Sequence, residues 1–172
     1  MEKHGTGVTF LDDVLNGGYE PEIVTTIYGP AGSGKTLLLL LAMRVSQEKI
    51  LFVDTEGGFS TERFAQVCDA YREVLERTIF LNPTTFDQQE DAVEELEKLV
   101  DSMDVGLVLF DTFTALYRVN ITQEDNYDLN KRLAKQLRTL VGIARDESIP
   151  VLTTTQVYTD IEDPEEYNVV GG

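Results

Sequence analysis

The chain alternates between short, continuously apolar segments and longer segments in which apolar residues recur every three or four positions. Continuous apolar runs are typical of strands buried on both faces of a sheet, whereas the second pattern predicts amphipathic helices. Alternating strands and helices favour a mostly parallel sheet with helices on both faces, so the expected fold class is α/β. Strands are predicted at residues 23–28, 49–54, 78–81, 105–110 and 151–155.

Amphipathic helices are predicted around these strands. Residues 9–16 show a short helical pattern that ends at Gly17 and Gly18. Residues 60–76 show a single helical pattern, with one face formed by Phe64, Val67, Cys68, Tyr71 and Leu75. The remaining helices are predicted from residue 37 to about residue 47, over 86–103 and over 127–146.

The segment after the last predicted strand is acidic and rich in turn-forming residues, and no strand or helix is predicted there. We therefore expect a sheet that is short of C-terminal edge strands, either because the domain is minimal or because the chain is a fragment. No linker, repeat or low-complexity segment divides the sequence. Residues 1–172 are accordingly expected to form one domain.

Residues 29–36 carry the clearest chemical signal, because GPAGSGKT fits G-x-x-x-x-G-K-[ST] at every fixed position. A predicted strand precedes it and an apolar helical run follows, whereas a chance glycine-rich turn would need neither. Lys35 is expected to reach the β- and γ-phosphates of a nucleotide, and the Thr36 hydroxyl to ligate Mg²⁺. The expected nucleotide-binding residues are Gly29, Pro30, Ala31, Gly32, Ser33, Gly34, Lys35 and Thr36.

Three polar residues follow other predicted strands, and parallel strand ends converge on the ligand crevice of such a fold. Asp111 ends the apolar run VGLVLF, as a Walker-B carboxylate does, and is expected to hold Mg²⁺ through water or Thr36. Glu56 can orient and partly deprotonate an attacking water. Gln156 can donate to a γ-phosphate and report its loss.

Each of these three assignments has a structural alternative. Asp111 could instead cap the next turn, and Thr112 could share that task. Glu56 could belong to the turn before Gly57 and Gly58. Gln156 could be a polar strand end.

The composition limits which partners and chemistries fit the chain. It has 31 acidic and 14 basic residues, with a net charge of −17, which repels nucleic acid unless the cations are clustered. The alternative explanation of this charge is a solvated acidic surface. A single cysteine fits a reducing cytoplasm, and with one histidine it disfavours both a zinc site and a Ser-His-Asp mechanism. No apolar run is long enough to span a membrane, so a cytoplasmic protein is expected.

Four segments, in this order and spacing, resemble the RecA-type ATPase core of the archaeal and eukaryotic recombinases: GPAGSGKT, FVDTEGGFSTERF, LVLFDTFTALYR and LTTTQV. The opening residues 6–36 look most like the archaeal RadB family, whose members consist of the ATPase core alone. The resemblance extends from Thr6 to Val157. It implies a P-loop NTPase with a RecA-like three-layer α/β/α fold and no separate N-terminal DNA-binding domain.

The resemblance also implies roles for single residues. Residues 29–36 match Walker A and Asp111 matches Walker B, with ATP and Mg²⁺ as cofactors. Glu56 matches the catalytic glutamate, and Gln156 matches the sensor glutamine; together with Lys35 these are the expected catalytic residues. Arg63 matches an arginine expected beside the adenine.

The chain departs from this family where its members contact DNA. The usual T-N-Q reads Thr154-Thr155-Gln156, so the asparagine is missing. The first DNA-loop region, 119–128, has no Lys or Arg, and the second, 158–167, has five acids and no base. Loops of this charge oppose a phosphate backbone, which argues against strand exchange by this chain alone.

The sequence therefore predicts a RadB-like accessory protein of homologous recombination and DNA repair, a weak ATPase in the nucleoid-associated cytoplasm. Its expected partner is the main, RadA-type recombinase, with single-stranded DNA bound weakly or indirectly, and a homo-oligomer is compatible with the pattern. One alternative is a KaiC-like regulatory ATPase that assembles without DNA. A further alternative is a degenerate paralogue without hydrolysis, which the retained Glu56, Asp111 and Gln156 disfavour.

Overall fold

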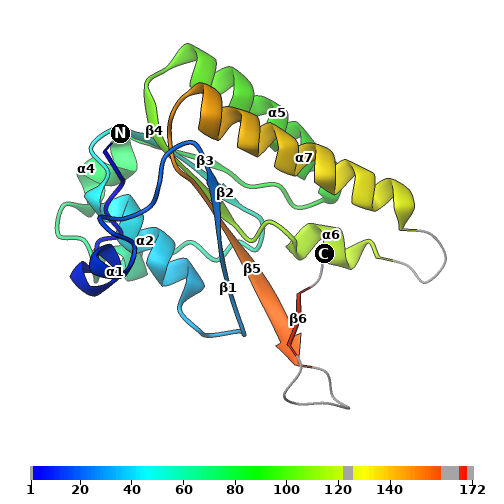
Figure 1. Ribbon diagram of the computed structural model, residues 1–172, viewed down its shortest axis with the longest axis horizontal. Coiled ribbons are helices and arrows are strands. Elements are labelled where there is room, and N and C mark those ends of the chain that lie inside the picture. Colours follow the sequence, from blue (N-terminus) through cyan, green and yellow to red (C-terminus); the bar gives the residue numbers. More distant parts are fainter. Residues whose placement is uncertain (1, 122–125, 160–166, 170–172) are drawn as a thin grey trace.

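The computed structural model describes residues 2–121, 126–159 and 167–169, and it contains a central sheet of mostly parallel strands (Figure 1). Five strands pair in parallel in the order β1-β5-β4-β2-β3. Their bounds are β1 (Val24–Gly29), β2 (Lys49–Asp54), β3 (Thr78–Leu81), β4 (Val105–Asp111) and β5 (Val151–Thr159). The predicted α/β class and mostly parallel sheet are confirmed.

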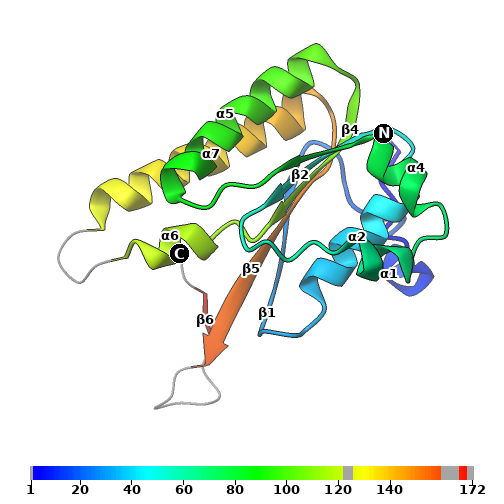
Figure 2. The ribbon, with the colours of Figure 1, turned by 180° about the vertical axis from the view of Figure 1, so that it is seen from behind.

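Helices cover both faces of this sheet and make a three-layer structure (Figures 1 and 2). One face carries α2 (Lys35–Val45), α3 (Thr61–Ala65) and α4 (Tyr71–Glu76), with α1 (Thr9–Val14) beside α2. The other face carries α5 (Phe86–Ser102), α6 (Ala115–Val119) and α7 (Tyr127–Asp146). Within the described residues, no helix is long and apolar enough to cross a membrane.

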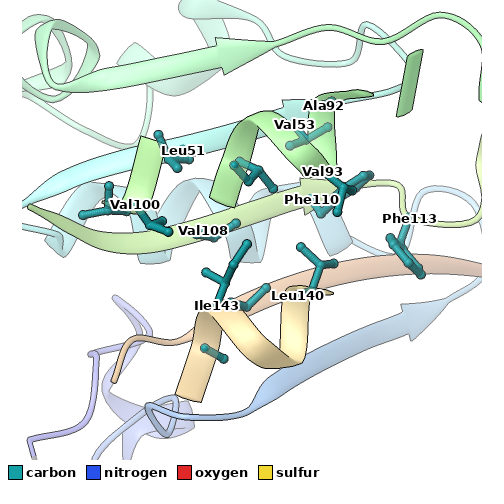
Figure 3. Packing of buried hydrophobic residues seen from close by; sticks show 14 of the residues in the cluster. Leu51, Val53, Ala92, Val93, Val100, Val108, Phe110, Phe113, Leu140 and Ile143 are labelled. Carbon is teal, nitrogen blue, oxygen red and sulfur yellow. The ribbon is translucent and has the colours of Figure 1, made fainter. Parts of the chain in front are cut away.

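The two helical layers enclose separate halves of the core. Successive residues of a strand point to opposite faces, so a strand between two helical layers must be apolar at nearly every position. In β4, Val108 and Phe110 pack against α5 and α7, a cluster shown in Figure 3, whereas Leu107 and Leu109 pack toward α2. The continuous apolar runs of the sequence follow from this arrangement.

Residues 60–76, predicted as one helix, form two short helices instead. The chain leaves α3 after Ala65, where the Val67 N–H bonds to the Phe64 carbonyl three residues back, and re-enters a helix at Tyr71. The break keeps Phe64, Cys68 and Val74 buried in the core on this side of the sheet, although the sequence predicted one continuous helix. Tertiary packing has therefore overridden the local helical pattern.

Three other elements differ from the sequence-based expectation. The helix α6 was not predicted, and β5 continues four residues beyond Thr155. The expectation that no strand follows it is wrong, because β6 (Tyr167–Val169) pairs antiparallel with the end of β5. The helix α1 is present but buries no residue, and Phe10 is 72% exposed.

Candidate nucleotide-binding site

Strand register brings the predicted site segments to one edge of the sheet. Gly29 at the end of β1 lies opposite Gln156 of β5, and Asp54 at the end of β2 lies opposite Asp111 at the end of β4. Because β5 and β4 are neighbours, the carboxyl ends of four adjacent strands meet there. The loop from β1 into α2 lies at the lower end of the sheet in Figure 1.

The loop of residues 30–34 has the backbone of a tight anion-binding turn. Gly32 and Gly34 have φ values of +73° and +89°, a region that costs an L-residue about 1–2 kcal/mol. Gly34 is also the N-cap of α2, so the free N–H groups of that helix start at the loop. A helix N-terminus preceded by a glycine-rich loop of this kind is suited to binding phosphate.

The Lys35 side chain folds back over this loop. Its ammonium group donates to the carbonyl oxygens of Gly29 at 3.0 Å and Pro30 at 2.8 Å. An ammonium group has three N–H donors, so one remains for a phosphate oxygen. The cation therefore lies where a triphosphate on the loop would place its charge.

The Thr36 and Asp111 side chains are in direct contact. The Thr36 hydroxyl donates to Asp111 Oδ2 at 2.6 Å, and the Thr154 hydroxyl donates to Asp111 Oδ1. Asp111 is only 6% exposed, so these bonds compensate for removing the carboxylate from water.

Thr36 and Asp111 form the donor set that a magnesium site on this loop would use. Both offer oxygen atoms, the ligand type that Mg²⁺ prefers, and Thr36 keeps its lone pairs because it is the donor in the contact. The described residues contain no group of three or more His, Cys, Asp or Glu side chains able to hold a metal.

Glu56 lies near Asp111 and is oriented by Thr112, whose hydroxyl donates to Glu56 Oε2 at 2.8 Å. The glutamate is exposed, as a group that meets water must be. It shares the edge of the sheet with the phosphate loop, although it comes from a different strand end.

Asp54 holds the segment that carries Glu56, a role that the sequence analysis missed. The buried Asp54 carboxylate accepts the backbone N–H groups of Glu56 at 3.2 Å, Gly58 at 3.1 Å and Phe59 at 2.9 Å. An aspartate that ends a strand three residues before a Gly-Gly pair is the available signal, because Asp commonly bonds to the backbone that follows it.

Thr55 joins β2 to β4 at the same place. Its N–H donates to the Asp111 carbonyl at 2.8 Å, its hydroxyl donates to the Thr112 carbonyl at 2.8 Å, and the Thr112 N–H donates back to that hydroxyl at 2.9 Å. The Asp111–Thr112 peptide bond is cis. These contacts fix the ends of the two strands that carry Glu56 and Asp111 relative to each other.

Two predicted residues lie outside this contact network. Gln156 is half-buried at the end of the sheet beside Gly29, and Arg63 is exposed on α3, where its N–H bonds to the Ser60 hydroxyl. Thr155, in place of the family's asparagine, is buried, and its hydroxyl contacts that of Thr114. Most of the second DNA-loop region, and residues 122–125 of the first, lie outside the described residues.

A parallel sheet that presents a G-x-x-x-x-G-K-T loop beside the carboxylate of a neighbouring strand end defines the P-loop proteins, here with the RecA-like three-layer arrangement. Residues 3–170 match the model of the Rad51 family. The chain belongs to this family and, within it, to the RadB proteins.

Individual relatives support this assignment. The chain is 41% identical over 159 residues to DNA repair and recombination protein RadB of Thermococcus kodakarensis, which covers 90% of this chain and 70% of that protein. It is 40% identical over 157 residues to the protein of the same name from Methanococcoides burtonii, covering 88% and 69%. The crystal structure of the RadB recombinase superposes with a TM-score of 0.78 at 39% identity, covering 92% of this chain and 72% of that one.

Proposed function

We propose that this chain binds ATP with Mg²⁺ on residues 29–36, hydrolyses it slowly, and uses the bound nucleotide to control contacts in homologous recombination. The observation that carries the proposal is the bond between the Thr36 hydroxyl and Asp111, beside a phosphate loop and a glutamate that Thr112 holds in place. A glycine-rich turn with only a structural role would not require this combination of side chains.

Binding would rest on the loop backbone, the N-terminus of α2 and Lys35. The N–H groups of the loop and the partial positive charge of the helix N-terminus attract phosphate oxygens. Lys35 would contribute its remaining N–H donor to the β- and γ-phosphates. Mg²⁺, held by Thr36 and Asp111, would neutralise phosphate charge.

Hydrolysis would require an activated water near the γ-phosphate, and Glu56 is the group suited to provide it. The bond to Thr112 occupies one carboxylate oxygen, and the other can accept a proton from a water. Lys35 and the loop N–H groups would stabilise the charge that develops on the phosphoryl oxygens. Gln156 would report loss of the γ-phosphate to the end of β5, and Arg63 would stack on the adenine.

The recombination role rests on the similarity to proteins named DNA repair and recombination protein RadB. This similarity favours recombination over a KaiC-like regulatory role. Because the loop regions are acidic, the proposed output is a nucleotide-dependent contact with the main recombinase, with weak or indirect binding of single-stranded DNA.

The experiment that tests this function is ATP turnover by the wild-type chain and Glu56→Gln, with and without single-stranded DNA across a salt series. We expect slow turnover by the wild type. Glu56→Gln should keep its ATP affinity and lose about 100-fold in turnover, the lower end of the usual contribution of an acid–base group. Glu97→Gln, an exposed carboxylate of α5, is the matched control. Equal turnover in Glu56→Gln and Glu97→Gln would show that Glu56 takes no part in the reaction. DNA stimulation that appears as salt is raised would show a DNA site masked by general repulsion at low salt, whereas no stimulation at any salt would argue against such a site.

A further inference from the structure

Three threonine hydroxyls contact the two carboxylates of the site, and that of Thr112 contacts both. The Thr112 hydroxyl lies 2.8 Å from Glu56 Oε2 and 3.2 Å from Asp111 Oδ1, and the Thr154 hydroxyl lies 3.2 Å from the Thr112 hydroxyl. Thr112 is 1% exposed, so neighbouring groups rather than bulk water decide where its proton points. Thr36 completes the set on the other side of Asp111.

Counting protons leaves one arrangement that satisfies both carboxylates. Each hydroxyl has a single proton to donate, and an ionised carboxylate only accepts. Thr36 donates to Asp111 Oδ2 and Thr154 donates to Asp111 Oδ1, so both oxygens of Asp111 have a donor. The proton of Thr112 is then available for Glu56 Oε2, at the shorter of its two carboxylate distances.

We propose that Thr112 is a positioning residue that fixes the Glu56 carboxylate for its proposed role; the inference rests on the proposed ATP hydrolysis. The backbone of the loop is already held by Asp54, which accepts the Glu56 N–H. The exposed Glu56 side chain would otherwise lose rotamer entropy each time it adopts the productive orientation. A buried donor on the neighbouring strand end supplies that orientation in advance.

The hydroxyl of Thr112, not its shape, is what this role requires. Thr112→Val replaces the hydroxyl by a methyl group of similar size, and Thr112→Ser keeps the hydroxyl and loses the methyl. We expect Thr112→Val to lower ATP turnover by about tenfold with ATP affinity changed by less than about twofold, because only the orientation of Glu56 is lost. Thr112→Ser is expected to restore turnover to near the wild-type rate.

A double-mutant cycle shows whether Thr112 acts through Glu56. In the Glu56→Gln background, adding Thr112→Val should cause no further loss of turnover. The melting temperature of each variant, measured in parallel, separates a rate effect from partial unfolding.

The outcomes distinguish this inference from the proposed function. Wild-type turnover in Thr112→Val, with Glu56→Gln inactive, would overturn the role of Thr112 and leave hydrolysis intact. A loss of ATP affinity in Thr112→Val, or an equal loss of turnover in both backgrounds, would also overturn it. A wild-type chain that binds ATP without turnover would instead overturn the proposed hydrolysis, and this inference with it.

Discussion

Three threonine hydroxyls contact the two carboxylates of the candidate site. Thr36 donates its proton to Asp111, and so it directs lone pairs away from that carboxylate, where a cation can use them. The Thr112 hydroxyl donates to Glu56 Oε2, and the Thr154 hydroxyl donates to Asp111 Oδ1. Both oxygens of the buried Asp111 carboxylate accept a hydrogen bond, which offsets part of the cost of removing the charge from water.

The Thr36 hydroxyl can be tested on its own. In Thr36→Val, ATP affinity should lose its dependence on Mg²⁺, because the substituted side chain has no oxygen for the metal. We expect EDTA to weaken ATP binding by about tenfold in the wild type, about 1.4 kcal/mol, and by much less in the variant. Titration of a fluorescent ATP analogue with and without EDTA measures this. Thr36→Ser is the control, and a variant that keeps the full Mg²⁺ effect would exclude Thr36 from the metal site.

At the scale of elements, α5 and α7 lie side by side over one face of the sheet (Figure 2), and charged side chains join them. Arg132 of α7 bonds to Glu90 and Asp87 of α5, and these hydrogen bonds raise the pKa of its guanidinium above the ordinary value. The guanidinium also lies over the Phe86 ring, 4.9 Å from the ring centre. Part of the acidic surface is thus balanced within the layer.

The helix α7 contains a glycine that costs stability without a visible packing reason. A Cβ added at Gly142 would meet no heavy atom within 4 Å. Gly142→Ala should therefore raise the free energy of unfolding by about 0.5–1 kcal/mol, through a smaller loss of backbone entropy on folding. Urea denaturation measures the change.

Gly106 provides the control for that prediction. In β4, a Cβ at this position would lie 2.7 Å from Cβ of Glu48 and 1.8 Å from Glu48 Oε2. Gly106→Ala should therefore lower the free energy of unfolding. If both substitutions raised the free energy of unfolding, the space around these glycines would not explain whether alanine stabilises or destabilises the chain.

The strands and the long helices could be predicted from the sequence, because the order of apolar and polar residues within each segment matches its burial in the structure. The run 49–54 and helix 127–146 match the structure residue for residue. Residues 60–76 could not, since the break between α3 and α4 depends on packing against helices and strands distant in sequence. The antiparallel pairing of β6 is likewise a tertiary choice, made by a short segment with a weak pattern of its own.

The candidate site likewise has features that could be predicted from the sequence and features that could not. The placement of Asp111 beside the G-x-x-x-x-G-K-T loop could be predicted, because the motif and the strand that ends in Asp111 both point to the same edge of a parallel sheet. The roles of Asp54, Thr112 and Thr154 could not, because each depends on which strand end lies beside another. The register of β2 against β4 supplies that information.

At the scale of the whole molecule, a Rad51-family core combines a nucleotide site with an acidic surface of net charge −17. Such a charge works against a long electrostatic contact with DNA and permits contacts with protein. A site that binds nucleotide can shift such contacts if the two nucleotide states differ in affinity for the partner. Control of partner contacts in this way requires first that ATP binds at residues 29–36.

The most direct test is the ATP affinity of Lys35→Ala, measured by calorimetry in the presence of Mg²⁺. Lys49→Ala is the control, because Lys49 is an exposed lysine at the opposite end of its strand from the site. If ATP binds at residues 29–36, the wild type and Lys49→Ala bind it alike, and Lys35→Ala loses at least about tenfold in affinity. Undiminished ATP affinity in Lys35→Ala would contradict binding at these residues.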